Sequence, residues 1–110
     1  MDTLLEPWKL ACTLWPELEY KNPPKFRINN RLRKTAGLCQ VETGAIELSG
    51  PLLAKYPSRM MRDIVPHETA HYIDFLLNGW YPRKRHHGKP WQEIMLALGC
   101  KPEPFHDMEL

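Results

Sequence analysis

The sequence has only three cysteines, Cys12, Cys39 and Cys100, and no C-x-x-C pair. This spacing excludes a cysteine-based zinc ribbon within the chain and argues against a disulfide framework. No run approaches the ~20 apolar residues that cross a bilayer, and the first residues lack the basic and apolar regions of a signal peptide. We therefore expect an intracellular protein, cytoplasmic or associated with a nucleoid or nucleus, with no membrane partner.

The chain also has little excess charge, because 15 Lys and Arg residues face 13 Asp and Glu residues, which gives a net charge of +2. This charge is too small to argue for nucleic-acid binding by itself. The 110 residues are 43% hydrophobic and 25% charged, as expected for one folded domain over 1–110 with a single modest core. The sequence contains no repeats and no low-complexity segment. Its eleven prolines divide it into short elements.

Hydrophobic spacing predicts an α+β fold. Apolar residues at helical spacing predict a helix over about residues 4–15. Strand-like patterns over 26–28, 38–42 and 45–48 predict a small, mostly antiparallel sheet of about three strands. Thr43-Gly44 between the last two strands predicts a hairpin.

The second half of the sequence is predicted to be mainly helical. A short helix over 52–55 precedes a long helix that begins at Ser58 and ends near Gly79. Pro66 lacks the backbone donor that this helix needs, so we expect a kink there rather than a new helix start. A last amphipathic helix runs from Pro90 to the glycine at position 99, and the tail over 101–110 shows no periodicity.

The most informative stretch is the H-E-x-x-H motif His67-Glu68-Thr69-Ala70-His71. Two histidines four residues apart face the same side of a helix, about 6 Å apart along its axis, so both imidazoles can bind one Zn²⁺ at about 2.0–2.1 Å. Glu68 is placed to act on a water at the metal rather than on the metal itself. The alternative is a core helix whose two histidines are satisfied by ordinary hydrogen bonds.

A third ligand is needed, because a catalytic zinc site uses three protein ligands and keeps one position open. The compact pattern with a histidine six residues after the second ligand fails, since Leu77 occupies that place. The remaining candidates are His86, His87 and His106. His87 lies just before a predicted helix, and Gly88 allows a sharp bend, but spacing alone leaves the choice between His86 and His87 open.

Other polar residues lie near the motif. Asp74, three residues after His71, could orient a ligand histidine, although a surface or capping role is the simpler expectation. A zinc hydrolase also needs a group that stabilises the oxyanion, and the sequence leaves four candidates for it. These candidates are Tyr72, Tyr81, His86 and His106.

Two groups of basic residues could hold nucleic-acid phosphates near the site if they share one face, which makes DNA a candidate partner. The alternative is a solvated loop and sheet edge, where Lys and Arg discourage aggregation. The first group is Arg27, Arg31, Arg33 and Lys34, and the second is Arg83, Lys84, Arg85 and Lys89.

The sequence resembles the SprT-like, or Spartan, family of zinc metalloproteases. The resemblance is carried by Val65-Pro66-His67-Glu68-Thr69-Ala70-His71 and by His87-Gly88-Lys89-Pro90-Trp91. The segment from Ala36 to Leu48, the following Pro51-Leu52-Leu53 and the tail around Phe105-His106-Asp107 are also similar to the family. The resemblance covers roughly residues 26–110.

This resemblance implies a minimal zincin-like metalloprotease domain, in which His67, His71 and His87 bind Zn²⁺ and Glu68 is the general base. It implies a zinc endopeptidase acting on protein, with DNA-bound or DNA-crosslinked proteins as the substrates associated with the family's role in DNA repair. The cysteine zinc ribbon usual in bacterial members has no counterpart in this sequence. The alternative is a non-catalytic module in which zinc stabilises a small fold that binds nucleic acid or protein.

Overall fold

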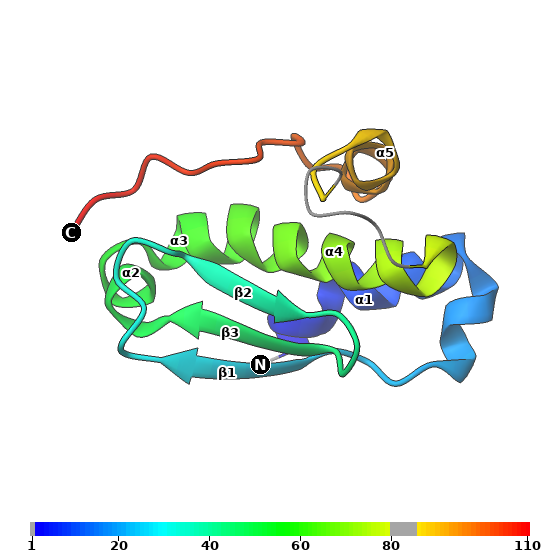
Figure 1. Cartoon of the computed structure of the whole chain (residues 1–110), viewed down its shortest axis with the longest axis horizontal. Helices are drawn as coiled ribbons and strands as arrows, with labels where there is room; N and C mark the ends of the chain where they lie inside the picture. Colours follow the sequence, from blue (N-terminus) through cyan, green and yellow to red (C-terminus); the bar gives the residue numbers. More distant parts are fainter. Residues whose placement is uncertain (1, 80–85) are drawn as a thin grey trace.

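The computed structural model describes residues 2–79 and 86–110 and has an α+β arrangement of a small sheet and several helices (Figure 1). A long helix, α4, lies at the centre and contacts α1, α5 and strand β2. In chain order the elements are α1 (Asp2–Leu14), the 3-10 helix η1 (Pro16–Tyr20), β1 (Lys25–Asn29), β2 (Gly37–Gln40), β3 (Ala45–Ser49), α2 (Gly50–Lys55), α3 (Pro57–Arg59), the π-helical segment η2 (Met60–Ile64), α4 (Val65–Asn78) and α5 (Lys89–Ala97). Among the described residues, no helix is long and apolar enough to cross a membrane.

The predicted α+β class and three-stranded sheet are confirmed, and β3 is the central strand. The hairpin of β2 and β3 is antiparallel, with Gln40 opposite Ala45 and the chain turning at Gly44, whose φ is +77°. β1 pairs with β3 in parallel, so the sheet is mixed rather than mostly antiparallel.

The loop over 30–36 is the physical reason for this mixed pairing. It carries the chain from the end of β1 past the end of β3 to the opposite edge of the sheet, so β1 and β2 are not neighbours (Figure 1). Ser49, at the end of β3, holds the loop: its N–H donates to the Ala36 carbonyl over 2.8 Å, and its hydroxyl donates to the Leu32 carbonyl over 2.6 Å. The same hydroxyl accepts the Leu52 N–H and caps α2.

The predicted long helix is present as α3, η2 and α4, which follow one another without a break (Figure 1). A π-helical turn precedes Pro66, and in it the Val65 N–H donates to the Met60 carbonyl, five residues back. This wider turn accommodates a proline that cannot donate to the carbonyl of Arg62. The helix ends at Asn78, and Gly79, with φ +85°, donates its N–H to the Phe75 carbonyl.

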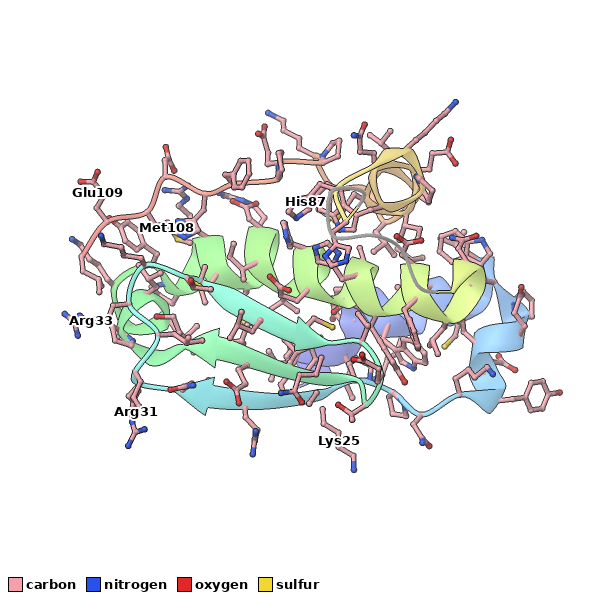
Figure 2. The ribbon with its side chains drawn as sticks, viewed as in Figure 1. Lys25, Arg31, Arg33, His87, Met108 and Glu109 are labelled. Carbon is pink, nitrogen blue, oxygen red and sulfur yellow. The ribbon has the colours of Figure 1, made fainter. Side chains whose placement is uncertain are left out.

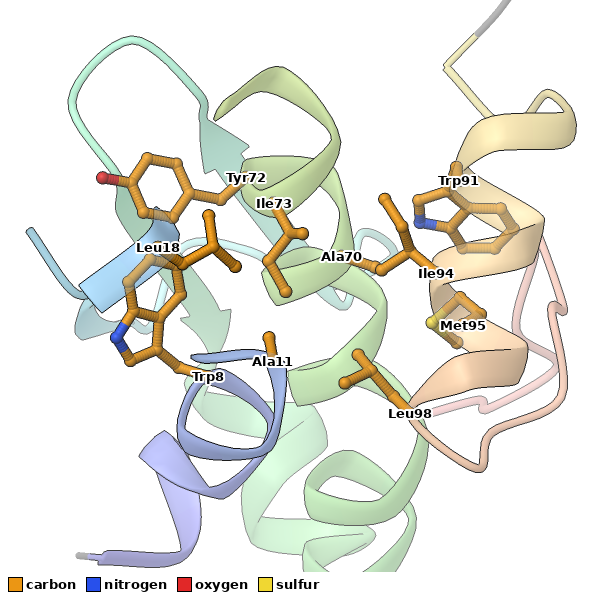
Figure 3. Packing of buried hydrophobic residues seen from close by; sticks show 10 residues of the cluster. All are labelled: Trp8, Ala11, Leu18, Ala70, Tyr72, Ile73, Trp91, Ile94, Met95 and Leu98. Atoms are coloured by element: carbon orange, nitrogen blue, oxygen red, sulfur yellow. The ribbon is translucent and has the colours of Figure 1, made fainter. Parts of the chain in front are cut away.

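Two apolar clusters position α4. The first fills the space between α1, α4 and α5 (Figure 3) and contains Trp8, Ala11, Leu18, Ala70, Tyr72, Ile73, Trp91, Ile94, Met95 and Leu98. The second joins the sheet to the helices before α4 and contains Ala36, Ile46, Leu48, Leu52, Met60, Ile64, Val65 and Met108. Burial of each large side chain contributes about 1.5–3 kcal/mol, so α4 is held from two sides.

Candidate metal centre

Three histidine rings meet on the side of α4 that faces α5. His67 and His71 lie on successive turns of α4, and His87 lies two residues before α5 (Figure 2). The Nε2 atoms of His67 and His71 are 3.3 Å apart, and the Nε2 of His87 is 3.2 Å from each of them. These three residues therefore form a group that could hold one metal ion.

This triangle of nitrogens fits a tetrahedral metal site. Four ligands at about 2.0–2.1 Å from a zinc ion have donor atoms about 3.3–3.4 Å apart, close to the observed spacing. Hydrogen bonding among the rings does not explain the triangle, because each Nε2 of a neutral imidazole either donates or accepts. Among three such atoms at least two are alike, so one pair is left in contact without a hydrogen bond. A shared cation would satisfy all three.

The surroundings keep these imidazoles neutral, which is the form that binds a metal. Burial, helped by the neighbouring His87, lowers the pKa of His67 from 6.5 to about 4. Burial, with His67 and His87 nearby, lowers the pKa of His71 to about 3. Burial also lowers the pKa of His87, with His86 as the second cause.

Glu68 lies beside the triangle, with its Oε2 3.8 Å from the Nε2 of His67. Its side chain is 10% exposed, and burial raises its pKa from 4.5 to about 8. Strand β2 covers the carboxyl closely: a Cβ at Gly37 would stand 2.9 Å from the Cγ and 3.2 Å from the Oε2 of Glu68. Glycine at this position therefore leaves the room that the carboxyl occupies.

An open cleft of about 1260 Å³ gives access to the histidines and to Glu68. One wall includes Gly37, Leu38 and Cys39 of β2, and the other includes Phe105 and His106 of the C-terminal tail. Burial, with Glu68 and Glu42 nearby, raises the pKa of the Cys39 thiol to about 12, so this thiol stays protonated at neutral pH.

The C-terminal tail has no regular structure, but it touches the site at several points. The backbone of Glu103 lies close enough to the His67 ring to raise its pKa, and the ring of Phe105 lies edge-on to His87 with centroids 5.9 Å apart. Such contacts orient metal-binding imidazoles in other sites. No periodic signal predicts this role, because the tail follows no helical or strand pattern.

Trp91 also makes contacts with the site that the sequence did not predict. Its spacing predicted a core position on the last helix, and it is fully buried in α5. Its ring also lies against all three histidines. The contacts with His67 and His71 join segments far apart in the sequence, so no local pattern could have indicated them.

The candidates for oxyanion stabilisation lie in different places. The Tyr72 hydroxyl donates to the Asn22 carbonyl over 2.8 Å, and its ring stacks on Trp8 in the core beside α1. His106 has both ring nitrogens engaged, one with the Lys34 carbonyl in the loop before β2 and the other with the Met108 N–H in the tail. His86 lines the cleft, with its ring centroid 6.2 Å from that of His71. Tyr81 lies outside the described residues.

Asp74 lies at the cleft, whereas the predicted basic residues are spread over several elements. Asp74 is buried, lines the cleft and accepts a 2.9 Å hydrogen bond from the Asn78 amide. Arg27 pairs with Glu47 on the sheet, and Arg31 and Arg33 project outward from the loop after β1 (Figure 2). Residues 83–85 of the second group lie outside the described part of the chain. In the rest of both groups, Lys34 lines the cleft and Lys89 begins α5.

Comparison with known proteins agrees with this geometry. The SprT-like family matches residues 14–108. Protein SprT of Actinobacillus succinogenes is 36% identical over 76 residues, which are 68% of this chain and 43% of that protein. Protein SprT of Vibrio parahaemolyticus is 34% identical over 88 residues, which are 79% of this chain and 51% of that protein. The chain thus spans about half the length of these curated relatives, and no solved structure matches it. The chain belongs to the SprT-like family.

Proposed function

We propose that this chain is a zinc-dependent endopeptidase that hydrolyses peptide bonds in protein substrates. The observation that carries the proposal is the triangle of Nε2 atoms of His67, His71 and His87, spaced 3.2–3.3 Å apart and open to a cleft beside a buried carboxyl. Membership of the SprT-like family supports the proposal. The resemblance of this chain to the family implies the same three ligands and Glu68 as the general base.

The proposed chemistry divides between the histidines and Glu68. His67, His71 and His87 would hold zinc, which when bound supplies Lewis acidity toward a water molecule and the scissile carbonyl. Glu68 takes a proton from the attacking water and later delivers it to the nitrogen of the leaving amine. A zinc ion held by the three neutral histidines would place positive charge beside Glu68, which would lower its pKa from the raised value and favour the carboxylate that accepts a proton.

Strand β2 supplies a surface for an extended substrate. It lies at the edge of the described sheet, next to β3 only. The Ser49 N–H bonds to the carbonyl of Ala36, and in an antiparallel pair alternate residues face the partner strand and the outer edge. The backbone groups of Gly37 and Cys39 therefore point outward, and both residues line the cleft. We expect an extended segment of the substrate protein to pair with this edge.

The test replaces Glu68 with glutamine, which keeps the size of the side chain and removes its basicity. We expect E68Q to keep stoichiometric zinc and to lose about 10²–10⁴-fold in the rate of casein cleavage. E47Q is the matched control, because Glu47 lies on the sheet and pairs with Arg27 and Asn29 away from the cleft. An E68Q protein that holds zinc and cleaves casein as fast as the parent would remove Glu68 from the proposed role.

The same assay separates the enzyme from the non-catalytic alternative. A structural zinc site would fill the fourth position with another protein ligand and would not need a buried carboxyl beside it. A parent protein that binds zinc tightly but cleaves neither itself nor casein would support the zinc-stabilised binding module instead.

Contact with DNA is a further proposal, supported by the outward-pointing side chains of Arg31 and Arg33 (Figure 2) and by Lys34 on the cleft wall. We expect the double variant R31E/R33E to weaken DNA binding and to reduce its dependence on salt concentration. Undetectable or salt-independent binding by the parent would contradict this proposal. We also propose an intracellular location, which the three free thiols support.

A further inference from the structure

Trp91 of α5 packs against the three histidines of the metal centre. Its side chain is fully buried and projects from α5 toward α4, in the first apolar cluster (Figure 3). The indole N–H donates to the backbone carbonyl of His67 over 3.3 Å. This bond fixes the indole against the backbone of the helix that carries two of the three histidines.

The indole ring is in contact with all three histidine rings. Its centroid lies 4.8 Å from that of His67 and 4.8 Å from that of His87, with the rings at 64° and 67°. It lies 5.5 Å from that of His71, with the rings nearly parallel at 20°. One rigid side chain therefore limits the rotation of three imidazoles, two by edge contacts and one by stacking.

We propose that Trp91 is a positioning residue that holds the imidazoles of His67, His71 and His87 in the arrangement that binds a metal ion. A free imidazole ring turns broadly about its last side-chain bond, so three such rings rarely point their Nε2 atoms at one place without support. The indole supplies that support from the side of α5 and does not line the cleft, whereas Glu68 lines the cleft next to the triangle. This inference rests on the metal-binding part of the proposed function and does not depend on proteolysis.

Trp8 provides a matched comparison within the same apolar cluster. It is also a buried tryptophan, 6% exposed, and it packs against α4 from α1 (Figure 3). Its ring stacks on Tyr72, with centroids 5.6 Å apart. Replacement of either tryptophan by phenylalanine removes similar core volume, but only Trp91 touches the metal centre.

The experiment measures zinc affinity of the parent, W91F and W8F by competition with a chelating dye, at a temperature where circular dichroism shows all three folded. The visible spectrum of each Co²⁺-loaded protein reports the geometry of the ligands. We expect W91F to bind zinc about 10–100-fold more weakly, as for loss of other contacts that orient ligands, and to shift the Co²⁺ bands. W8F should match the parent in both measurements although its thermal unfolding temperature falls. If W91F does not fold, W91Y takes its place.

The outcomes are distinct. Equal zinc affinity and identical Co²⁺ spectra for W91F and the parent would overturn the positioning role. Equal weakening in W91F and W8F would also overturn it, because the effect would then follow core stability alone. A parent protein that binds no zinc would instead contradict the proposed function, so the failure of the two proposals can be told apart.

Discussion

The two sides of the metal centre are built in different ways. On one side, α4 presents His67 and His71 four residues apart, so the regular turn of the helix places both imidazoles on one face, where their Nε2 atoms lie 3.3 Å apart. On the other side, His87 precedes α5 and reaches its place only because α5 packs on α4. The first side depends on local geometry, and the second depends on contacts between segments distant in the sequence.

The C-terminal tail belongs to the second side and is held at many points. Met108 is buried in the cluster beside the sheet, and Asp107 forms an ion pair with Arg59. The Tyr56 hydroxyl donates to the Glu109 carbonyl over 2.7 Å and accepts the Glu109 N–H. These contacts place the tail along the cleft without regular secondary structure (Figure 1). The position of His87 therefore depends on the packing of α5 and the tail against the rest of the fold, whereas His67 and His71 need only α4.

The largest expected effect comes from removing one histidine on each side. H71A and H87A should both lose stoichiometric zinc, because two imidazoles alone bind the ion weakly.

Zinc should protect the amides at the start of α5 against hydrogen exchange more than those of α4, since α4 is packed on both sides without it. Exchange measured with and without zinc checks this, with H87A as the control that should show no added protection. Equal added protection of both helices would contradict the comparison.

The features of the fold that could be predicted from the sequence are those that depend on local geometry. The hairpin around Gly44, the helix through the H-E-x-x-H motif and its end at Gly79 were predictable, because each has a local period or a turn residue. The parallel pairing of β1 was not, since it depends on how the loop over 30–36 crosses the end of β3. The π-helical turn before Pro66 was predicted only as a kink.

Within the candidate site, spacing brought His67 and His71 together but could not choose between His86 and His87. The structure brings the His87 ring into the triangle, whereas the His86 ring lies 6.2 Å from that of His71. Trp91 and the tail contacts were missed for a physical reason. Both act across segments far apart in the sequence, and no local pattern reports such contacts.

A second prediction concerns the pH dependence of the metal-free protein. The pKa values of His67 and His71 fall from 6.5 to about 4 and about 3 on folding, so the folded state binds fewer protons and loses stability as pH falls below 6.5. The pKa of Glu68 rises from 4.5 to about 8, so its contribution is lost as pH rises from 4.5 through 8. As pH falls below 6.5, the stability lost through His67 and His71 exceeds the stability gained through Glu68. Between pH 6.5 and 8, of these three groups only Glu68 changes the stability.

We therefore expect the free energy of unfolding of the metal-free protein to be highest near pH 6.5 and to decrease toward pH 5 and pH 8. Urea unfolding across this range measures it. In E68Q the decrease between pH 6.5 and 8 should disappear, while the decrease on the acid side should remain. A stability that rises steadily from pH 5 to 8 in the parent would show that Glu68 is not protonated in the folded, metal-free protein.

The smallest expected effect tests the anchoring of the tail. The His106 Nε2–H donates to the Lys34 carbonyl over 2.8 Å, and its Nδ1 accepts the Met108 N–H over 3.1 Å. H106A should lower the free energy of unfolding by about 1–2 kcal/mol through loss of these two bonds. F105A is the neighbouring control, because Phe105 is 82% exposed and its loss should change the free energy by about 0.5 kcal/mol or less. An H106A protein as stable as the parent would mean that the tail does not depend on this anchor.

The central claim is that the imidazoles of His67, His71 and His87 together bind one zinc ion. X-ray absorption at the zinc edge of the zinc-loaded protein tests it most directly, because it counts the ligands and measures their distances. We predict three imidazole nitrogens at about 2.0–2.1 Å and no sulfur. A sulfur ligand at about 2.3 Å, or fewer than three imidazoles at the zinc, would contradict the account.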